Sequence, residues 1–84
     1  MQHLKVNSVY FRAVRNGLKT FEVRKLNDRS FFVGEVIALD EWDEQAQRYT
    51  GNSMVKRITY VLKGPLENCG LPEGVAVLAL GKYL

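Results

Sequence analysis

Residues 17–24, which read GLKTFEVR, join the end of one expected element to the start of the next and decide how the chain folds. Gly17 suits the left-handed backbone conformation that follows a helix, so we expect a helix over residues 9–16 before it. Apolar and polar side chains then alternate over residues 20–24, and this period of two predicts a β-strand. A helix that passes directly into a strand is typical of a mixed α and β domain.

The expected helix is short, so it depends on packing against the rest of the fold. Asn7 or Ser8 can cap its first turn, because a short polar side chain accepts hydrogen bonds from the free backbone N–H groups there. Arg12 and Arg15 are expected to face outward. The spacing of a buried apolar stripe is supplied by Val9, Tyr10, Ala13 and Val14.

The rest of the chain is rich in β-forming residues and is interrupted by turns. We expect turns at residues 27–30 and 34–35, and a polar loop over residues 43–52. Besides residues 20–24, strands are expected over residues 3–6, 36–39, 54–62 and 75–80. Five strands and one early helix predict an α+β, mainly β fold, in which the helix plugs a small closed or nearly closed barrel. The length predicts a single domain over residues 1–84.

Aromatic side chains are expected to divide between the core and the surface. The chain has nine of them, and most must be buried in so small a domain. We expect Phe11, Phe21 and one of Phe31 or Phe32 in the core. Trp42 lies between two acidic residues, so we expect it to cover the barrel as a lid rather than to stack on a base.

The composition is that of an ordinary folded protein, with 46% hydrophobic and 25% charged residues. A single cysteine, Cys69, and a single histidine, His3, exclude an internal disulfide and a Cys/His zinc site, so we expect no metal and no cofactor. No apolar run approaches the roughly 18–20 residues that span a bilayer. Residues 1–5 lack the apolar region of a secretory signal, so we expect a cytoplasmic protein without a membrane partner.

Charge is unevenly distributed along the chain. Residues 1–30 carry seven basic side chains against two acidic ones, a net charge of +5, whereas residues 31–50 carry one against five, a net charge of −4. The sequence pI is about 9.2. A clustered basic segment favours a polyanion such as nucleic acid as the partner, because lysine and arginine neutralise phosphates. A solvated basic face without a ligand remains the alternative.

The polar face of the strand expected over residues 20–24 carries the clearest chemical signal. Alternation places Thr20, Glu22 and Arg24 on one face, with Lys19 at its mouth. Two cations, a carboxylate and a hydroxyl converge within about 13 Å and can recognise a phosphate or the polar edge of a base. The alternative is a solvated Glu22–Arg24 pair, which contributes about 0–1 kcal/mol.

The spacing Gly17-x-Lys19-x-x-Glu22-x-Arg24 resembles the GxKxxExR motif of the ASCH domain family, which belongs to the PUA-like superfamily. The resemblance to a small ASCH-like subfamily continues in order through residues 3–62. It implies a PUA-like barrel in which Lys19, Glu22 and Arg24 line a cleft between the barrel and the helix after the first strand. In the family this cleft is the proposed RNA or nucleotide site. Leu26 departs from the pattern as an extra residue.

We therefore expect an RNA-binding module that has no catalytic activity. Lys19 and Arg24 would contact phosphate, and Glu22 would accept from a base or orient Arg24. Tyr10 is the candidate for base stacking. The basic footprint is extended by Lys25, Arg29, Arg12 and Arg15. A domain this small often gains stability by pairing, so a homodimer is compatible with the sequence.

Two alternatives remain open. Some ASCH proteins are amidohydrolases that act on acylated nucleosides, and Lys19 matches the lysine of their resembling segment. In this alternative Lys19 and Glu22, with Thr20 two residues earlier on the same face, would be the catalytic groups. Glu22 stands where those enzymes have a nucleophilic threonine, and a carboxylate cannot simply replace that hydroxyl. The other alternative is a protein-interaction module that uses the acidic residues 40–44 and has no small ligand.

Overall fold

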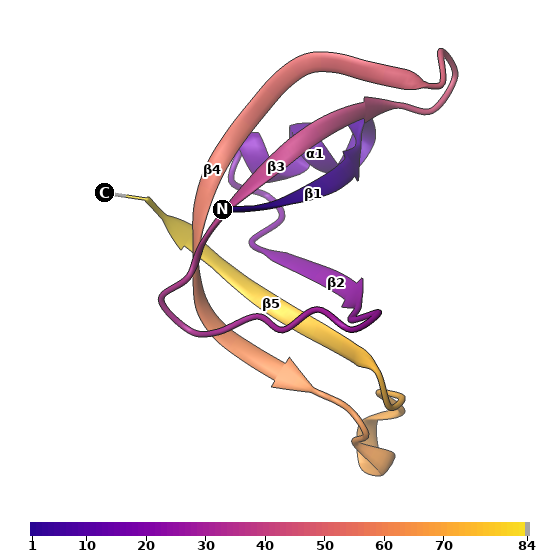
Figure 1. The fold of residues 1–84 in the computed structure, drawn as a ribbon, viewed down its shortest axis with the longest axis vertical. Coiled ribbons are helices and arrows are strands. Elements are labelled where there is room, and N and C mark those ends of the chain that lie inside the picture. Colours follow the sequence, from indigo (N-terminus) through magenta and orange to yellow (C-terminus); the bar gives the residue numbers. More distant parts are fainter. Residues whose placement is uncertain (84) are drawn as a thin grey trace.

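The computed structural model describes residues 1–83 and shows a mainly β fold with five strands and one early helix. The chain runs through β1 (Gln2–Asn7), α1 (Ser8–Arg15), β2 (Phe21–Lys25), β3 (Val36–Asp43), β4 (Arg48–Lys63), a 3₁₀ turn (Glu67–Cys69) and β5 (Val75–Lys82). The strands form one sheet in the order β1-β3-β4-β5-β2. The sheet curls into a half-barrel, which confirms the expected fold class (Figure 1).

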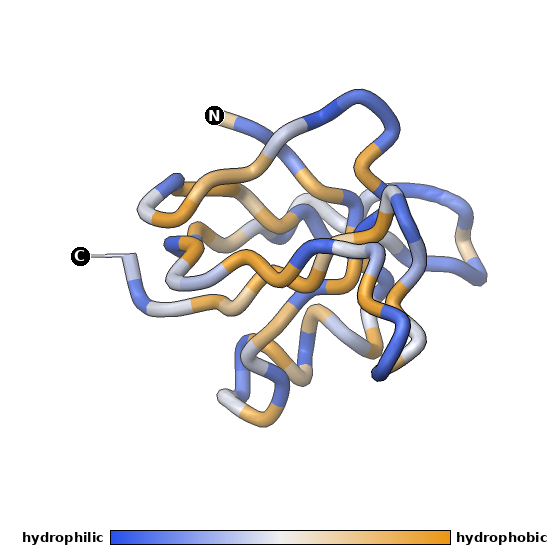
Figure 2. The backbone as a smooth tube through the Cα atoms, turned by 90° about the horizontal axis from the view of Figure 1, so that it is seen from below, coloured by the Kyte–Doolittle hydropathy of each residue, from blue (hydrophilic) through white to orange (hydrophobic). Residues whose placement is uncertain are grey.

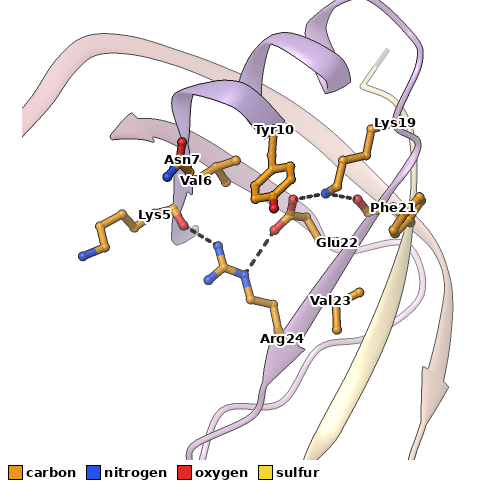
Figure 3. Close-up of a pocket in the computed structure, with 9 residues that line it drawn as sticks. All are labelled: Lys5, Val6, Asn7, Tyr10, Lys19, Phe21, Glu22, Val23 and Arg24. Carbon is orange, nitrogen blue, oxygen red and sulfur yellow. Dashed lines mark hydrogen bonds and ion pairs between the residues drawn. The ribbon is translucent and has the colours of Figure 1, made fainter. Parts of the chain in front are cut away.

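The two edges of this sheet are β1 and β2, and no strand ladder joins them in the described part of the chain. β1 is parallel to β3, and every other neighbouring pair is antiparallel. The half-barrel is therefore open between β1 and β2, a gap that we call the seam. Because α1 follows β1 directly and ends shortly before β2, the helix lies at one end of this seam (Figures 1 and 3).

The prediction of a polar loop over residues 43–52 is wrong, because β3 and β4 form a long hairpin there. Only residues 44–47 form a turn. The Asp43 carboxylate tightens it by accepting from the backbone N–H groups of Gln45 and Ala46. Trp42 and Tyr49 pack edge to face across the two strands, with ring centroids 5.0 Å apart. The hairpin projects from the rest of the fold (Figure 1). Residues 44–53 are exposed and mostly polar, so this part of the sequence resembles a loop.

Helix α1 forms nearly where the sequence predicts it. The Asn7 side chain caps it by accepting from the N–H of Val9, and Gly17 adopts a φ of 78° after its last turn. The N–H groups of Gly17 and Leu18 return to the carbonyls of Val14 and Ala13, which is a Schellman ending. This tight reversal sends the chain straight into β2.

The buried stripe of α1 differs from the expected one. Phe11 and Val14 are each only 2% exposed, whereas Val9 and Tyr10 are 62% and 55% exposed. Phe11 can enter the core because it is three residues before Val14 and therefore shares its face of the helix. Tyr10 is turned about 100° from Phe11 around the helix axis and faces the seam.

The core lies inside the curl of the sheet and under α1. In Figure 2 many apolar stretches run through the middle of the molecule, and many hydrophilic ones lie in the loops at its periphery. Phe11 and Phe31 are core residues as expected, but Phe21 is 44% exposed and the expectation that it is buried is wrong. Phe32, the alternative to Phe31, is 67% exposed. No helix in residues 1–83 is both long and apolar enough to cross a membrane. The core cluster consists of Leu4, Val6, Phe11, Val14, Phe31, Ile37, Leu39, Ile58, Ala76 and Leu78.

Candidate functional site

A cleft of about 540 Å³ opens in the seam beside α1 (Figure 3). Its size is within the range of small-molecule and cofactor sites. The walls come from the end of β1, the first turn of α1, the end of the helix-to-strand turn and most of β2. The residues that line the cleft are Lys5, Val6, Asn7, Tyr10, Lys19, Phe21, Glu22, Val23 and Arg24.

Glu22 forms the floor of this cleft and is only 5% exposed. Side chains of β2 alternate between two faces, as predicted. In contrast to an ordinary strand, its apolar side chains are exposed and its glutamate is buried. Phe21 and Val23 point outward, whereas Glu22 points into the curl of the sheet. An ionised carboxylate is costly to bury unless charged or hydrogen-bonding groups surround it. Its neighbours therefore decide what Glu22 can do.

Lys19 pairs with one oxygen of this carboxylate. Its Nζ lies 2.7 Å from Oε1 of Glu22 and also donates to the backbone carbonyl of Phe21 at 2.7 Å. The Phe21 carbonyl lies on the free edge of β2, where no neighbouring strand forms backbone hydrogen bonds. Lys19 is thus held in place by the edge of the sheet and by the buried carboxylate, and its side chain is 17% exposed.

Arg24 pairs with the other oxygen and bridges the seam. Its Nε lies 3.2 Å from Oε2 of Glu22, and its Nη2 donates to the backbone carbonyl of Lys5 at 2.6 Å. The guanidinium therefore joins β2 to the free edge of β1 in the absence of strand pairing. Within residues 1–83, the Nε of Arg24 is buried without a well-aligned hydrogen bond. The ion pair with Glu22 stabilises it instead.

The cluster keeps hydrogen-bonding capacity for a ligand. An ammonium group has three donors, and Lys19 uses two of them within the described chain. Arg24 has five donors, and its contacts with Lys5 and Glu22 engage only Nη2 and Nε. Each oxygen of Glu22 can accept a second hydrogen bond. Two cations surround one carboxylate, so the cluster carries a net charge of +1.

Aromatic rings form the rim of the cleft beside Lys19. The Nζ of Lys19 lies 4.9 Å from the ring centroid of Phe21 and 5.5 Å from that of Tyr10. Figure 3 shows the Tyr10 hydroxyl directed toward the Glu22 carboxylate. Both side chains are about half exposed, so each offers aromatic surface to a ligand.

The seam continues beyond the cleft to Arg29, whose Nη1 lies 3.3 Å from the backbone carbonyl of His3. His3 and Lys5 are two residues apart on β1, so Arg24 and Arg29 meet this edge about 7 Å apart. Lys25 lies at the exposed end of β2. The structure therefore brings Lys19, Glu22, Arg24 and Tyr10 together and sets Arg29 along the same seam.

Three other residues considered from the sequence lie away from the cleft lining. Arg12 is about 200° around the helix from Tyr10 and borders a second hollow that includes Asp43. Arg15 is exposed and lies over the ring of Phe11. Thr20 is exposed and precedes β2, with its carbonyl paired to β5. The hydroxyl of Thr20 is therefore not part of the described cleft.

Lys5, Asn7 and Val23 line the cleft but were not singled out by the sequence analysis. Their place in the cleft depends on β1 lying opposite β2. No local sequence pattern indicates which strands lie opposite one another. Lys5 contributes its carbonyl, while its ammonium group points away and lies 4.3 Å from the centroid of the Trp42 ring (Figure 3).

Trp42 lies on β3 near the turn of the hairpin, opposite Tyr49 on β4. It is partly buried, packs on Tyr49 and donates from Nε1 to Glu44 at 3.1 Å.

A second buried carboxylate, Glu41, lies at the base of the hairpin. It is also 5% exposed, but its Oε1 accepts from neutral donors, the Thr50 hydroxyl at 2.8 Å and the Asn52 amide at 3.0 Å. These hydrogen bonds, that of Asn52 first, lower the pKa of Glu41 although burial opposes the shift. Nearby, the hydrogen bond from Ser53 lowers the pKa of Asp40, which also contacts His3 at 2.8 Å.

The fold and the cleft define a small open β half-barrel that presents a buried, paired carboxylate to a surface cleft. The chain belongs to the family described as Domain of unknown function (DUF3850), whose model matches residues 1–80. No curated protein sequence matches the chain closely enough to supply a relative. Within residues 1–83, no three His, Cys, Asp or Glu side chains gather as metal ligands would. The function is therefore inferred from the chemistry of the cleft.

Proposed function

We propose that this protein binds single-stranded RNA, with one nucleotide seated in the cleft of the seam. The observation that carries the proposal is the Lys19–Glu22–Arg24 cluster, which combines a buried acceptor with spare cationic donors on the floor of an open cleft. Single-stranded RNA is commonly read by stacking a splayed base on an aromatic ring and by hydrogen bonds to its edge. The resemblance to the ASCH domain family points the same way.

Each part of a nucleotide has a matching group in this arrangement. The base stacks on the open face of Tyr10 and meets Glu22 and Lys19 with its polar edge. The phosphates lie along the seam, where Arg24 and Arg29 meet the edge of β1. Arginine suits this role because its planar fork can donate two hydrogen bonds to one phosphate.

A fluorescence titration with a short labelled RNA tests the proposal. Simple removal of Lys19 and Arg24 would leave Glu22 buried and unpaired, so we choose the triple variant Lys19→Met/Glu22→Gln/Arg24→Met, which removes the whole charged cluster. A matched control, Lys63→Met/Glu67→Gln/Lys82→Met, makes the same change in formal charge at exposed positions that do not line the cleft.

We expect the wild type and the control to bind alike and the triple variant to bind at least tenfold more weakly. Two phosphate contacts predict that log K falls with log[salt] with a slope of about −1.4. Equal binding by the triple variant and the control would place the RNA outside the cleft and overturn the proposal.

A further inference from the structure

On the floor of the cleft, the Glu22 carboxylate presents only hydrogen-bond acceptors to the edge of a base. The Glu22 side chain is 6% exposed, and an ionised carboxylate accepts but cannot donate. Its two oxygens lie side by side, and each is already engaged by a cation, Oε1 by Lys19 and Oε2 by Arg24. These two contacts fix the direction of the carboxylate. A base that meets it must therefore supply two adjacent donors.

Among the four RNA bases, guanine alone has such an edge. Its ring N1–H and its exocyclic amino group are adjacent donors that match the two oxygens of a carboxylate. Adenine and cytosine each place an acceptor nitrogen beside their single amino group, and uracil has one N–H between two carbonyl oxygens. A buried carboxylate oxygen that faces an acceptor loses its hydration without compensation, which penalises these three bases.

We propose that the cleft selects guanine and that Glu22 is the residue that determines this specificity. The inference rests on the proposed RNA-binding function and adds the base to it. The O6 atom of guanine lies next to its N1–H, so it meets the cation beside the same carboxylate oxygen. Lys19, 2.7 Å from Oε1, has a donor left for O6. Both donors and the acceptor of the guanine edge are then satisfied.

The arrangement also explains why this carboxylate is paired with cations instead of neutral donors. A neutral donor such as a threonine hydroxyl would be fully used by Glu22. Lys19 and Arg24 each have donors that they do not direct at Glu22, so they can serve the carboxylate and a ligand together.

The experiment compares the affinities of five RNAs that differ only in their central base. A fluorescein-labelled uridine heptamer carries guanine, inosine, adenine, cytosine or uracil at its centre, and its affinity for the full chain is measured at low salt. Inosine keeps N1–H, O6 and the stacking surface but lacks the exocyclic amino group. The comparison of guanine with inosine thus isolates one donor and requires no variant of the protein.

We expect guanine to bind about tenfold more tightly than inosine, within the range for a bidentate contact. In Glu22→Gln, whose amide presents one donor and one acceptor, this ratio should fall to near one. Glu44→Gln, on the exposed hairpin turn, should keep the tenfold ratio. Thermal unfolding of both variants checks that they are folded.

Three results would overturn the inference. Equal binding of the five RNAs by the wild type would remove guanine selection and leave RNA binding in place. A guanine-to-inosine ratio that survives in folded Glu22→Gln would show that another group reads the base. Absence of binding to all five RNAs would remove the proposed function together with the inference.

Discussion

The two buried glutamates, Glu22 on β2 and Glu41 on β3, are equally hidden from solvent but are held in different ways. Glu41 is held by the hydroxyl of Thr50 and the amide of Asn52, both from the opposite strand of the hairpin. Arg12 is 4.0 Å away. Glu22 is held by two cations that keep spare donors and lie in an open cleft.

These contacts indicate a structural role for the Glu41 carboxylate and a ligand-binding role for the Glu22 carboxylate. Glu41 lies where the register between β3 and β4 shifts, and its hydrogen bonds bind the irregular segment of β4 to β3. Gly51, between Thr50 and Asn52, has a φ of 93°, which an L side chain adopts only with strain. Neutral donors suit this role, because they fix Oε1 of Glu41 to the opposite strand of the hairpin. Cations with unused donors suit a site that also meets a ligand.

The largest expected effect comes from breaking the Glu22 cluster on one side only. Lys19→Met/Arg24→Met leaves a buried charge without partners and should lower the free energy of unfolding by about 3 kcal/mol or more. Adding Glu22→Gln should restore most of that loss, since the buried charge is then gone. Urea unfolding measures both variants, and equal stability of the double and triple variants would contradict the account.

A smaller loss is expected at the hairpin. Thr50→Val keeps the shape of the side chain but removes one of the donors to Glu41, and should cost about 2 kcal/mol of unfolding free energy. RNA affinity should not change, because Thr50 does not line the cleft. Chemical denaturation and the RNA titration on the same sample check both halves of this prediction. A tenfold loss of affinity would mean that the two regions are coupled.

The lowered pKa values of Glu41 and Asp40 predict a loss of stability in acid. Both folded-state pKa values lie below the ordinary values of 4.5 and 3.8, so in that range the unfolded chain binds more protons than the folded one. Stability is therefore complete above about pH 5 and falls as the pH drops, by up to about 1.4 kcal/mol per pH unit for each proton. Thermal unfolding between pH 3 and pH 6 should show this slope, and Glu41→Gln should reduce it. A Glu41→Gln profile as steep as that of the wild type would contradict this assignment.

The smallest effect is expected for the arginines on α1. Arg12 and Arg15 lie outside the cleft lining, so Arg12→Gln and Arg15→Gln should each weaken RNA binding by less than about threefold, through long-range charge alone. Arg29→Gln, on the seam, should weaken it more. The RNA titration distinguishes these cases, and a larger loss from either helix variant would extend the interface onto α1.

The sequence predicts the convergence of Lys19, Glu22 and Arg24 because strand alternation and the helix-ending Gly17 are local signals. It does not predict that Glu22 is buried, since that depends on β2 being the edge of a curled sheet. The assignment of Phe21 to the core fails for the same reason. An apolar side chain on an edge strand has no second layer to cover it here.

The hairpin shows the other limit of local patterns. Residues 43–52 are polar and contain Gly51, so they resemble a loop, but cross-strand contacts such as that between Trp42 and Tyr49 keep them in strands. Lys5 was missed as a cleft residue because its contribution is a backbone carbonyl, which is independent of side-chain type. The hairpin strands and the Lys5 contact both depend on which strands lie next to each other in the fold.

The most direct test of the account is to map RNA contacts on the amide resonances of the wild-type chain by NMR. Addition of a guanine-containing heptamer should shift amides of Lys5, Tyr10 and residues 19–24, and leave those of Thr50 and Asn52 in place. This result would identify the cleft as the binding site and Glu41 as a structural carboxylate. Shifts confined to the hairpin, with the cleft unperturbed, would contradict the central claim.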